Sequence, residues 1–440
     1  MLTLILMGTA LTAVSATRTG PSPQSVEADS APEVCAFSGL ILNQNGDLAR
    51  IGRCHFNQGG DHWQNDNESL NLFDMTRKHL APLPEEVRNT DGRWLNDGTL
   101  LVFGGFPAAQ CQMPINCAVG YPTQASYRYL PKTQSWQTLS TLRIPHEFGE
   151  SLDGGNYDIQ NFLPRKDALV VRTGQFFYLT TDPDLATSMD LPSGKPIATT
   201  LHSWDPADNK QASITTRKGH NRATLLELQD GRLALIGGSA QRERVALEKE
   251  CLDCRDEFVS LGTLEGARAT EVFDLKSNTW TTGARSHYAG GHAVRLANGR
   301  IFKLSMTGGF NAGRGYSVEI ADAALNSWTP APAFPLPPEA YPPPSLPTHE
   351  LAYIAIEMFA VGNRVYVPCY AYALQESGLR QSSGYKVALW DDETGSWSVL
   401  TDWKQELPLF IGQIDAETIF VQYSSSMERR SLHVPSMPRD

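Results

Sequence analysis

The sequence has no run of lysine or arginine, and charged residues are scarce throughout it. Only 19% of the 440 residues are charged, and the formal net charge is -11 at pH 7. Nucleic acids and anionic membranes both select positively charged surfaces, so this balance argues against either as a partner. Neutral or cationic ligands fit the overall charge better.

No apolar stretch is long enough to cross a membrane as a helix, which takes about 20 residues. The apolar residues 1–16 fall short of this, and Val14 and Ala16 occupy the positions that a signal peptidase reads. We expect residues 1–16 to be a signal peptide, residues 17–34 a flexible leader and residues 35–440 a single domain. The protein is therefore predicted to be secreted or periplasmic, with no membrane insertion after cleavage. A membrane anchor is the alternative, because the usual basic residues before the apolar stretch are missing.

Signatures of several enzyme classes are also missing. The sequence has no serine nucleophile elbow, no phosphate-binding glycine loop and no dinucleotide fingerprint, so no cofactor is expected. With 41% hydrophobic and 9% aromatic residues, the chain can nevertheless bury a large core, which excludes a disordered protein.

What the sequence does contain is a repeated hairpin pattern. The turn Asn96-Asp97-Gly98 precedes the apolar run LLVFGG, and Asp230-Gly231 precedes LALIGG. Two apolar runs joined by a turn rich in Asn, Asp or Gly predict a β-hairpin. Five weaker copies are centred on Asn45-Gly46, Lys166-Asp167, Asn298-Gly299, Gly362-Asn363 and Asp415-Ala416.

A second unit of eleven residues alternates with the hairpins. It shows strand-like alternation with an Asp near its middle and a Trp at its end, as in TEVFDLKSNTW, which ends at Trp280. Further copies end at Trp328 and Trp397, one ends at Trp136 with Leu130 in the Asp position, and two keep Asp74 and Asp205 but end at Leu80 and Gln211.

Each pair of units supplies four short antiparallel strands, which is one blade of a β-propeller. The diglycine-then-Trp pattern resembles the kelch repeat over nearly the whole mature chain, and the resemblance implies a kelch-type β-propeller without indicating any chemistry. Seven hairpins predict an all-β fold of seven four-stranded blades, with six blades as the alternative. Residues 409–434 supply only three strands for the last blade, so we expect an N-terminal strand near residues 18–34 to close the ring.

The seven cysteines fit an oxidising compartment. Cys251 and Cys254 form a Cys-x-x-Cys pair, which we expect to be a disulfide; half a zinc site or a redox motif is the alternative. Cys369 is left unpaired and is expected to be buried. The predicted disulfides join Cys111 to Cys117, Cys251 to Cys254, and Cys35 to Cys54.

The connections between strands differ between the two faces of the predicted propeller. On one face the turns are short, whereas the other face carries long connections, and long loops on a rigid scaffold are usually functional. We therefore predict that the long-connection face binds the ligand. The alternative is that these long loops vary in sequence and length without having a function. The long connections are residues 107–125, 173–197, 239–267 and 371–384 within blades, and 143–157 and 331–348 between blades.

Polar residues at the starts of the inner strands should line the channel mouth on this face. Several are histidines, which can bind transition metals, but no short ligand spacing appears, so no metal is expected. His55 and His62, with Trp63 nearby, lie in a loop whose spacing matches no metal site and which suits a glycan equally well. The ligand-binding candidates at the mouth are His220, Asn221, Arg222, His287, Tyr288, His292, Asn311, Arg314, His349, Glu350, Tyr353 and Tyr370.

Two enzyme families bear comparison. Residues 265–275 look like the region of bacterial sialic acid mutarotases that carries an acidic and an arginine residue, which implies that Arg268 pairs a sugar carboxylate and Glu271 acts as acid–base catalyst. If the resemblance carries no function, Arg268 and Glu271 are surface residues that lead into a strand. The propeller is also similar to the galactose oxidase scaffold, but its copper ligands cannot be placed in this sequence. The sequence thus predicts an exported propeller that binds a glycan or protein, with a mutarotase-like epimerase as the alternative and a copper oxidase disfavoured.

Overall fold

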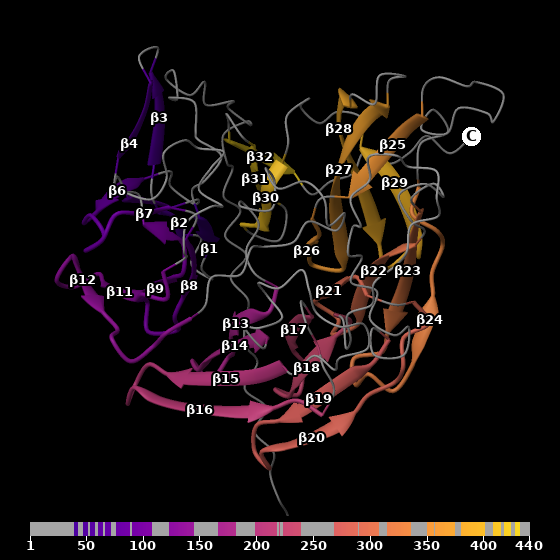
Figure 1. Ribbon diagram of the computed structural model, residues 1–440. Coiled ribbons are helices and arrows are strands. Elements are labelled where there is room, and N and C mark those ends of the chain that lie inside the picture. The colour runs from indigo at the N-terminus through magenta and orange to yellow at the C-terminus, as the bar shows by residue number, and fades with distance from the viewer. Residues whose placement is uncertain are drawn as a thin grey trace, which may run out of the picture.

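The computed structural model consists of β-strands arranged in a ring (Figure 1). It describes residues 39–431 except for 108–122, 145–165, 182–198, 239–267, 308–314, 336–349, 375–379, 401–407 and gaps of one to four residues elsewhere. Among the residues described, no helix is long and apolar enough to cross a membrane. The described chain is all-β, as predicted.

Seven antiparallel sheets form the blades, which confirms the seven-bladed β-propeller predicted from the hairpin count (Figure 1). Each blade takes its strands from one continuous stretch of the chain, although strands of other sheets intervene within blades 1 and 2. The first three blades are β1(Gly39–Leu42), β2(Asp47–Ile51), β5(Asn67–Asn71) and β6(Arg77–Leu80); β8(Asp91–Trp94), β9(Leu100–Phe103), β11(Ser126–Leu130) and β12(Ser135–Thr138); and β13(Ala168–Val170), β14(Phe176–Thr181), β15(Thr199–Asp205) and β16(Lys210–Thr215).

The remaining blades follow the same order, with small departures. Blade 6 has a fifth strand because its inner strand is interrupted, and blade 7 has three strands in the part of the chain described. They are β17(Thr224–Glu227), β18(Leu233–Ile236), β19(Thr270–Asp274) and β20(Thr279–Thr282); β21(His292–Arg295), β22(Ile301–Thr307), β23(Gly315–Ala321) and β24(Trp328–Pro330); β25(Glu350–Ala355), β26(Phe359–Val361), β27(Arg364–Leu374), β28(Arg380–Asp391) and β29(Ser396–Leu400); and β30(Pro408–Gln413), β31(Thr418–Tyr423) and β32(Met427–Ser431).

The core is divided into seven hydrophobic clusters, each between two neighbouring blades. The ring closes where Phe420 of blade 7 packs against Leu48 and Leu70 of blade 1. The N-terminal closing strand predicted near residues 18–34 lies outside the described residues. The packing between blades 7 and 1 nevertheless joins the two ends of the described ring.

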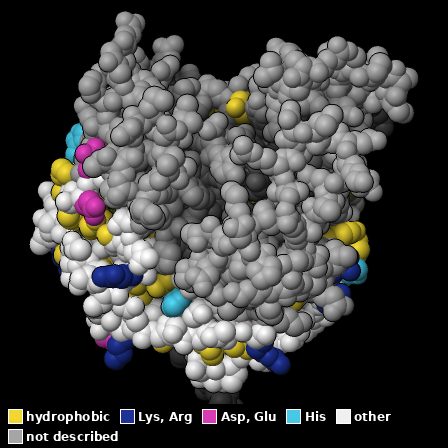
Figure 2. Space-filling view, viewed as in Figure 1, with side chains coloured by type: hydrophobic (Ala, Val, Ile, Leu, Met, Phe, Trp, Pro, Cys, Tyr) yellow, Lys and Arg dark blue, Asp and Glu magenta, His cyan; other side chains and the backbone are white. Residues whose placement is uncertain are grey.

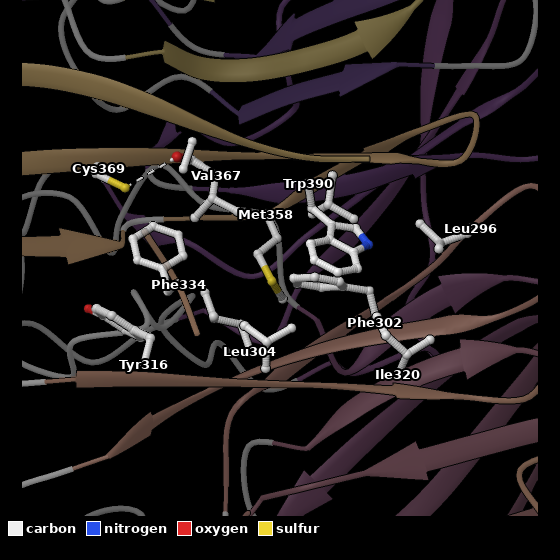
Figure 3. Packing of buried hydrophobic residues seen from close by; sticks show 13 residues of the cluster. Leu296, Phe302, Leu304, Tyr316, Ile320, Phe334, Met358, Val367, Cys369 and Trp390 are labelled. Carbon is white, nitrogen blue, oxygen red and sulfur yellow. Dashed lines mark hydrogen bonds between the residues drawn. The ribbon is translucent and has the colours of Figure 1, made fainter. Parts of the chain in front are cut away.

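Between blades 5 and 6, aromatic rings pack among aliphatic side chains (Figure 3). Phe302 and Trp390 have ring centroids 5.8 Å apart, and Met358 lies beside them in the same cluster. Cys369 lies in this cluster as a free, buried thiol, as predicted, and its Sγ contacts the carbonyl of Val367 at 3.3 Å. Burial strongly raises the pKa of this thiol, so it remains an unreactive core residue.

The eleven-residue unit is explained by its turn and by its last residue. In the turn after β19, the carboxylate of Asp274 accepts the backbone N–H of Lys276 at 2.8 Å, and Asn278 has a φ of 55°. Asp is favoured in such turns because its carboxylate accepts backbone N–H groups, and Asn and Gly are favoured because they tolerate a positive φ. The terminal indole N–H donates to a carbonyl of the connection after the preceding blade in three copies: Trp136 to Ala81, Trp328 to Ala284 and Trp397 to Pro332.

Gln211 replaces Trp in the third blade and keeps the same hydrogen bond. Its side-chain amide donates to the carbonyl of Thr141, which follows the preceding blade, at 3.0 Å. In these four copies the repeated position therefore supplies a donor that reaches the preceding blade, whereas the Trp280 indole N–H has no partner among the described residues and Leu80 has no donor.

Four predictions about local structure were wrong. The turn of blade 3 is not at Lys166-Asp167 but at residues 171–175, because β13 begins only at Ala168. The connection predicted at residues 173–197 is correspondingly shorter, since β14 occupies its first part. The connection predicted at residues 371–384 is largely paired strand, because β27 and β28 extend to Leu374 and from Arg380. Finally, the loop carrying His55 and His62 is an antiparallel ribbon, β3(Arg53–Asn57) with β4(Gly60–Gln64), in which these two residues are directly opposite each other.

The short turns on one face are joined from blade to blade. Asn96 of blade 2 donates to the carbonyl of Arg172 of blade 3 at 2.8 Å, and the Arg172 guanidinium contacts Glu227 of blade 4 at 2.9 Å. Asn298 of blade 5 donates to Asp392 of blade 6 at 2.8 Å. These side chains are engaged in holding the ring together, so this face has a structural role.

Candidate functional site

The candidate site lies on the opposite face, where blades 4 and 5 meet. Strands one and three of a blade both begin on this face, because successive strands run in opposite directions. The residues just before β19 and β21 therefore lie there, and they bring several of the predicted site residues together.

His220 and Glu271 form a buried pair within blade 4. His220 precedes β17, Glu271 lies on β19, and the two are 0% and 1% exposed with Nε2 and Oε2 3.0 Å apart. The other ring nitrogen of His220 lies 3.1 Å from the carbonyl of Gly237. His220 is thus a hydrogen-bonded core histidine, and Glu271 lies in the core, which corrects the interpretation of Glu271 as a surface residue.

Glu319 and Lys303 form a second buried pair in blade 5. The register of β22 and β23 places them opposite each other, both fully buried, with Nζ and Oε1 3.0 Å apart. Lys303 also donates to the Ser286 hydroxyl at 2.5 Å and to the Tyr288 carbonyl at 2.6 Å, and Ser286 donates to Glu319. All three protons of this ammonium group are therefore engaged within the protein.

The pKa values of this pair follow from burial and from mutual attraction. Burial lowers the pKa of Lys303 to about 8 although Glu319 opposes this shift. Burial raises the pKa of Glu319, but Lys303, Ser286 and the backbone N–H of His287 together hold it below its usual value. Glu319 is therefore a carboxylate at neutral pH.

His287 connects this buried hydrogen-bond network to the protein surface. Its backbone N–H donates to Glu319 Oε2 at 2.9 Å, its Nδ1 lies 3.3 Å from the same oxygen, and its side chain is 50% exposed. The ring of Tyr288 lies beside it, with centroids 6.4 Å apart. His287 is thus an accessible imidazole fixed by a buried carboxylate.

Arg268 completes the group. The backbone N–H of Ser286 donates to the Arg268 carbonyl at 3.0 Å, and the positive charge of Arg268 helps to lower the pKa of Lys303. The guanidinium is partly buried, and its Nε has no hydrogen-bond partner among the residues that the structure describes.

Glu271 and Glu319 occupy the same position of the repeat, three residues before the turn Asp. In both blades this carboxylate contacts the connection that enters the blade, through His220 in one and through Ser286 and His287 in the other. In blade 2 the equivalent Tyr127 donates to Glu85 of the entering connection at 2.8 Å. These contacts fix the path of each connection and so support the surface above it.

Sequence reasoning missed Lys303, Glu319 and Ser286. A signal was present, because Lys303 interrupts the apolar strand IFKLSMT, and Glu319 lies as far before the turn Asp as Glu271 does. Only the pairing register shows that the two charges meet.

The other predicted residues are placed only in part. His292 begins β21 and is buried, whereas only the backbones of Glu350, Tyr353 and Tyr370 are described, in β25 and β27. Of Cys54, too, only the backbone is described, in β3. Outside the described residues lie Asn221, Arg222, Asn311, Arg314, His349, Cys35, Cys111, Cys117, Cys251 and Cys254, and with them the three predicted disulfides.

One ion pair crosses the middle of the ring. Lys166, just before β13 of blade 3, pairs with Glu357, which precedes β26 of blade 6. Blades 3 and 6 are separated by two blades on one side and three on the other, and β13 and β26 lie around the centre of the ring in Figure 1. The pair therefore spans the channel.

Charge does not otherwise gather on the described surface in the view of Figure 2, where acidic, basic and histidine side chains are scattered singly. Within the described part of the chain, no three His, Cys, Asp or Glu residues are grouped to hold a metal ion. Fold and site together define a seven-bladed β-propeller with a buried ionic cluster under one face. No protein-family model matches the chain, and no curated protein matches it either.

Proposed function

We propose that the protein is an exported β-propeller that binds a glycan or protein ligand on its long-connection face. One observation carries this proposal: the two faces are built differently. The short turns of one face are joined to one another by Asn96, Arg172 and Asn298. The other face receives long connections, such as the one between β18 and β19, residues 237–269.

The geometry of the site supports binding over the mutarotase-like alternative. Glu271, which that resemblance assigns as the acid–base catalyst, is enclosed and hydrogen-bonded to His220. A general acid or base must come within hydrogen-bond reach of its substrate. Binding requires no such group, and the buried pairs under this face supply the rigidity that lowers the entropic cost of recognition.

The test is to shorten one long connection. We expect replacement of residues 240–266 by a short Gly-Ser linker to abolish or weaken ligand binding, measured on a glycan array and by affinity capture of proteins. The control changes the opposite face, with Asp230→Asn in the turn between β17 and β18. Unchanged binding by the shortened variant, or equal loss in the control, would contradict the proposal.

Export is tested separately. Expression of the full chain should yield a protein outside the cytoplasm whose N-terminus, read by mass spectrometry, follows Ala16. An intact residue 1 in the cytoplasmic fraction would overturn this part of the proposal.

A further inference from the structure

The ribbon formed by β3 and β4 is an addition to blade 1 rather than one of its four strands. It lies within residues 52–66, which connect the second and third strands of the blade, as residues 237–269 do in blade 4. The ribbon therefore belongs to the long-connection face, and Figure 1 shows it standing out from blade 1. Its two strands pair with each other and with no other strand of the described chain.

The register of this ribbon brings two histidines to facing positions. His55 of β3 is directly opposite His62 of β4. Directly opposite residues share one face of an antiparallel pair, and their Cβ atoms lie about 4.5–5.5 Å apart. The neighbouring pair, Cys54 with Trp63, falls on the other face, because successive residues of a strand alternate between faces. The ribbon thus places two imidazole-bearing residues together on a face that excludes the cysteine.

Two imidazoles at facing positions form a chelating pair for a metal ion. Histidine is the commonest metal ligand in proteins, and imidazole suits Zn²⁺, Cu²⁺ and Ni²⁺, whereas Mg²⁺ and Ca²⁺ prefer oxygen ligands. Once one imidazole has bound the ion, the second meets it at a high effective concentration. The chain also carries a net charge of -11, which attracts cations.

The rest of this face limits what else can bind the ion. Its other two pairs are Arg53 with Gln64 and Asn57 with Gly60, so no carboxylate shares the face with the histidines. The ligands that the ribbon supplies are therefore neutral imidazoles, and water is left to complete the coordination shell.

We propose that His55 and His62 bind one divalent transition-metal ion of the Zn²⁺, Cu²⁺ and Ni²⁺ class between β3 and β4. The inference goes beyond the proposed function and does not depend on it. It also departs from the expectation of no metal, which was drawn from spacing along the chain. Six residues separate the two histidines in the sequence, and only the pairing of the strands makes them neighbours.

The experiment titrates the untagged full-length protein with ZnCl₂ and follows its histidine ring signals by NMR. The signals of His55 and His62, assigned with His55→Gln and His62→Gln, should shift together and saturate at one ion for the pair. Either substitution should weaken binding by roughly a hundredfold, because the remaining imidazole binds without its partner. Binding should also weaken below a pH of about 6.5, where imidazoles are protonated. MgCl₂ at the same concentration should cause no shift.

The matched control is His79→Gln, which removes an exposed histidine of β6 in the same blade and should leave Zn²⁺ binding unchanged. The double variant of His55→Gln with His62→Gln should lose little beyond either single variant, since each one already breaks the chelate, whereas independent sites would lose binding additively. Unchanged signals of the other histidines show that the variants are folded. Absence of a saturable shift, a shift of only one of the two signals, or binding by His62→Gln equal to that of the parent protein would overturn the inference.

Discussion

At the residue scale, the site depends on glycines that bring backbones into contact. Gly291, just before β21, has a φ of 84°, and a Cβ placed on it would lie 2.3 Å from the carbonyl oxygen of Leu304. A Cβ on Gly237 would lie 3.0 Å from the carbonyl oxygens of Gly290 and Gly291. Blade 4 and the connection into blade 5 therefore approach so closely beside His220 and Ser286 that no side chain fits between them.

This close approach predicts a difference between two alanine substitutions. Gly98→Ala, at a φ of 80° with no atom within 4 Å of the new Cβ, should lower the free energy of unfolding by about 1 kcal/mol from backbone strain alone. Gly291→Ala adds a clash and should cost roughly 1–3 kcal/mol more. Urea unfolding of both variants measures the difference. Equal losses would mean that Gly291 is needed only for its backbone angle.

At the scale of elements, the sequence predicts hairpins well wherever the turn carries its own signal. The pairs Asp230-Gly231 and Asn298-Gly299 contain glycines with φ of 89° and 87°, so their turns could be placed from residue type alone. In blade 3 the turn glycine is Gly174, whereas the polar pair Lys166-Asp167, where the sequence predicts the turn, lies before the first strand. Local composition could not decide between two turn-like segments six residues apart.

The site was less predictable than the strands. His220, Glu271, His287 and Arg268 were recognisable by residue type, but their partners depend on register. Lys303 meets Glu319 only because β22 and β23 pair with Ile301 opposite Ala321. A shift of one residue would turn one charge to the other face of the sheet.

The turn aspartates make a prediction about acid stability. Burial raises the pKa of Asp322, but the Ser327 hydroxyl and the backbone N–H groups of Asn326 and Ala324 outweigh this and lower it. A carboxyl whose folded pKa is depressed stabilises the protein above its unfolded pKa of about 3.9 and loses that contribution as the pH falls through the folded value. Asp322→Ala should therefore cost about 1 kcal/mol at pH 7.

The difference between the parent protein and Asp322→Ala should shrink as the pH falls below about 4. Urea unfolding at pH 7, 5 and 3 measures it. Glu393→Ala, at an exposed turn position of blade 6, is the control and should change stability little at any of these values. A difference that stayed constant with pH would show that the Asp322 turn is held by contacts independent of its charge.

At the scale of the whole molecule, the ring is held in two ways. Neighbouring blades share hydrophobic clusters, and the ion pair of Lys166 with Glu357 connects blades that are not neighbours. Glu357 is 2% exposed and its Oε2 has no hydrogen-bond partner among the described residues, whereas the Lys166 side chain is 18% exposed. The two partners therefore differ in how easily they can return to water.

This asymmetry predicts unequal effects of removing each partner. Lys166→Met leaves a buried carboxylate unpaired and should lower the free energy of unfolding by about 3–5 kcal/mol. Glu357→Leu leaves a lysine whose long stem can carry its ammonium group to solvent, so its loss should be smaller. The double variant Lys166→Met with Glu357→Leu should recover most of the stability lost in Lys166→Met, because no buried charge remains.

Denaturant unfolding of the three variants tests this reasoning, and Lys210→Met, which removes an exposed ion pair with Asp208, is the control expected to have little effect. Hydrogen exchange locates the change: Lys166→Met should reduce protection in β13 and β26 together, since the pair joins opposite sides of the ring. Equal losses in the two single variants, or loss of protection in one blade alone, would show that the pair does not connect the two halves of the propeller. Protection lost on both sides would show that the centre of the ring contributes to its closure alongside the packing of each blade on the next.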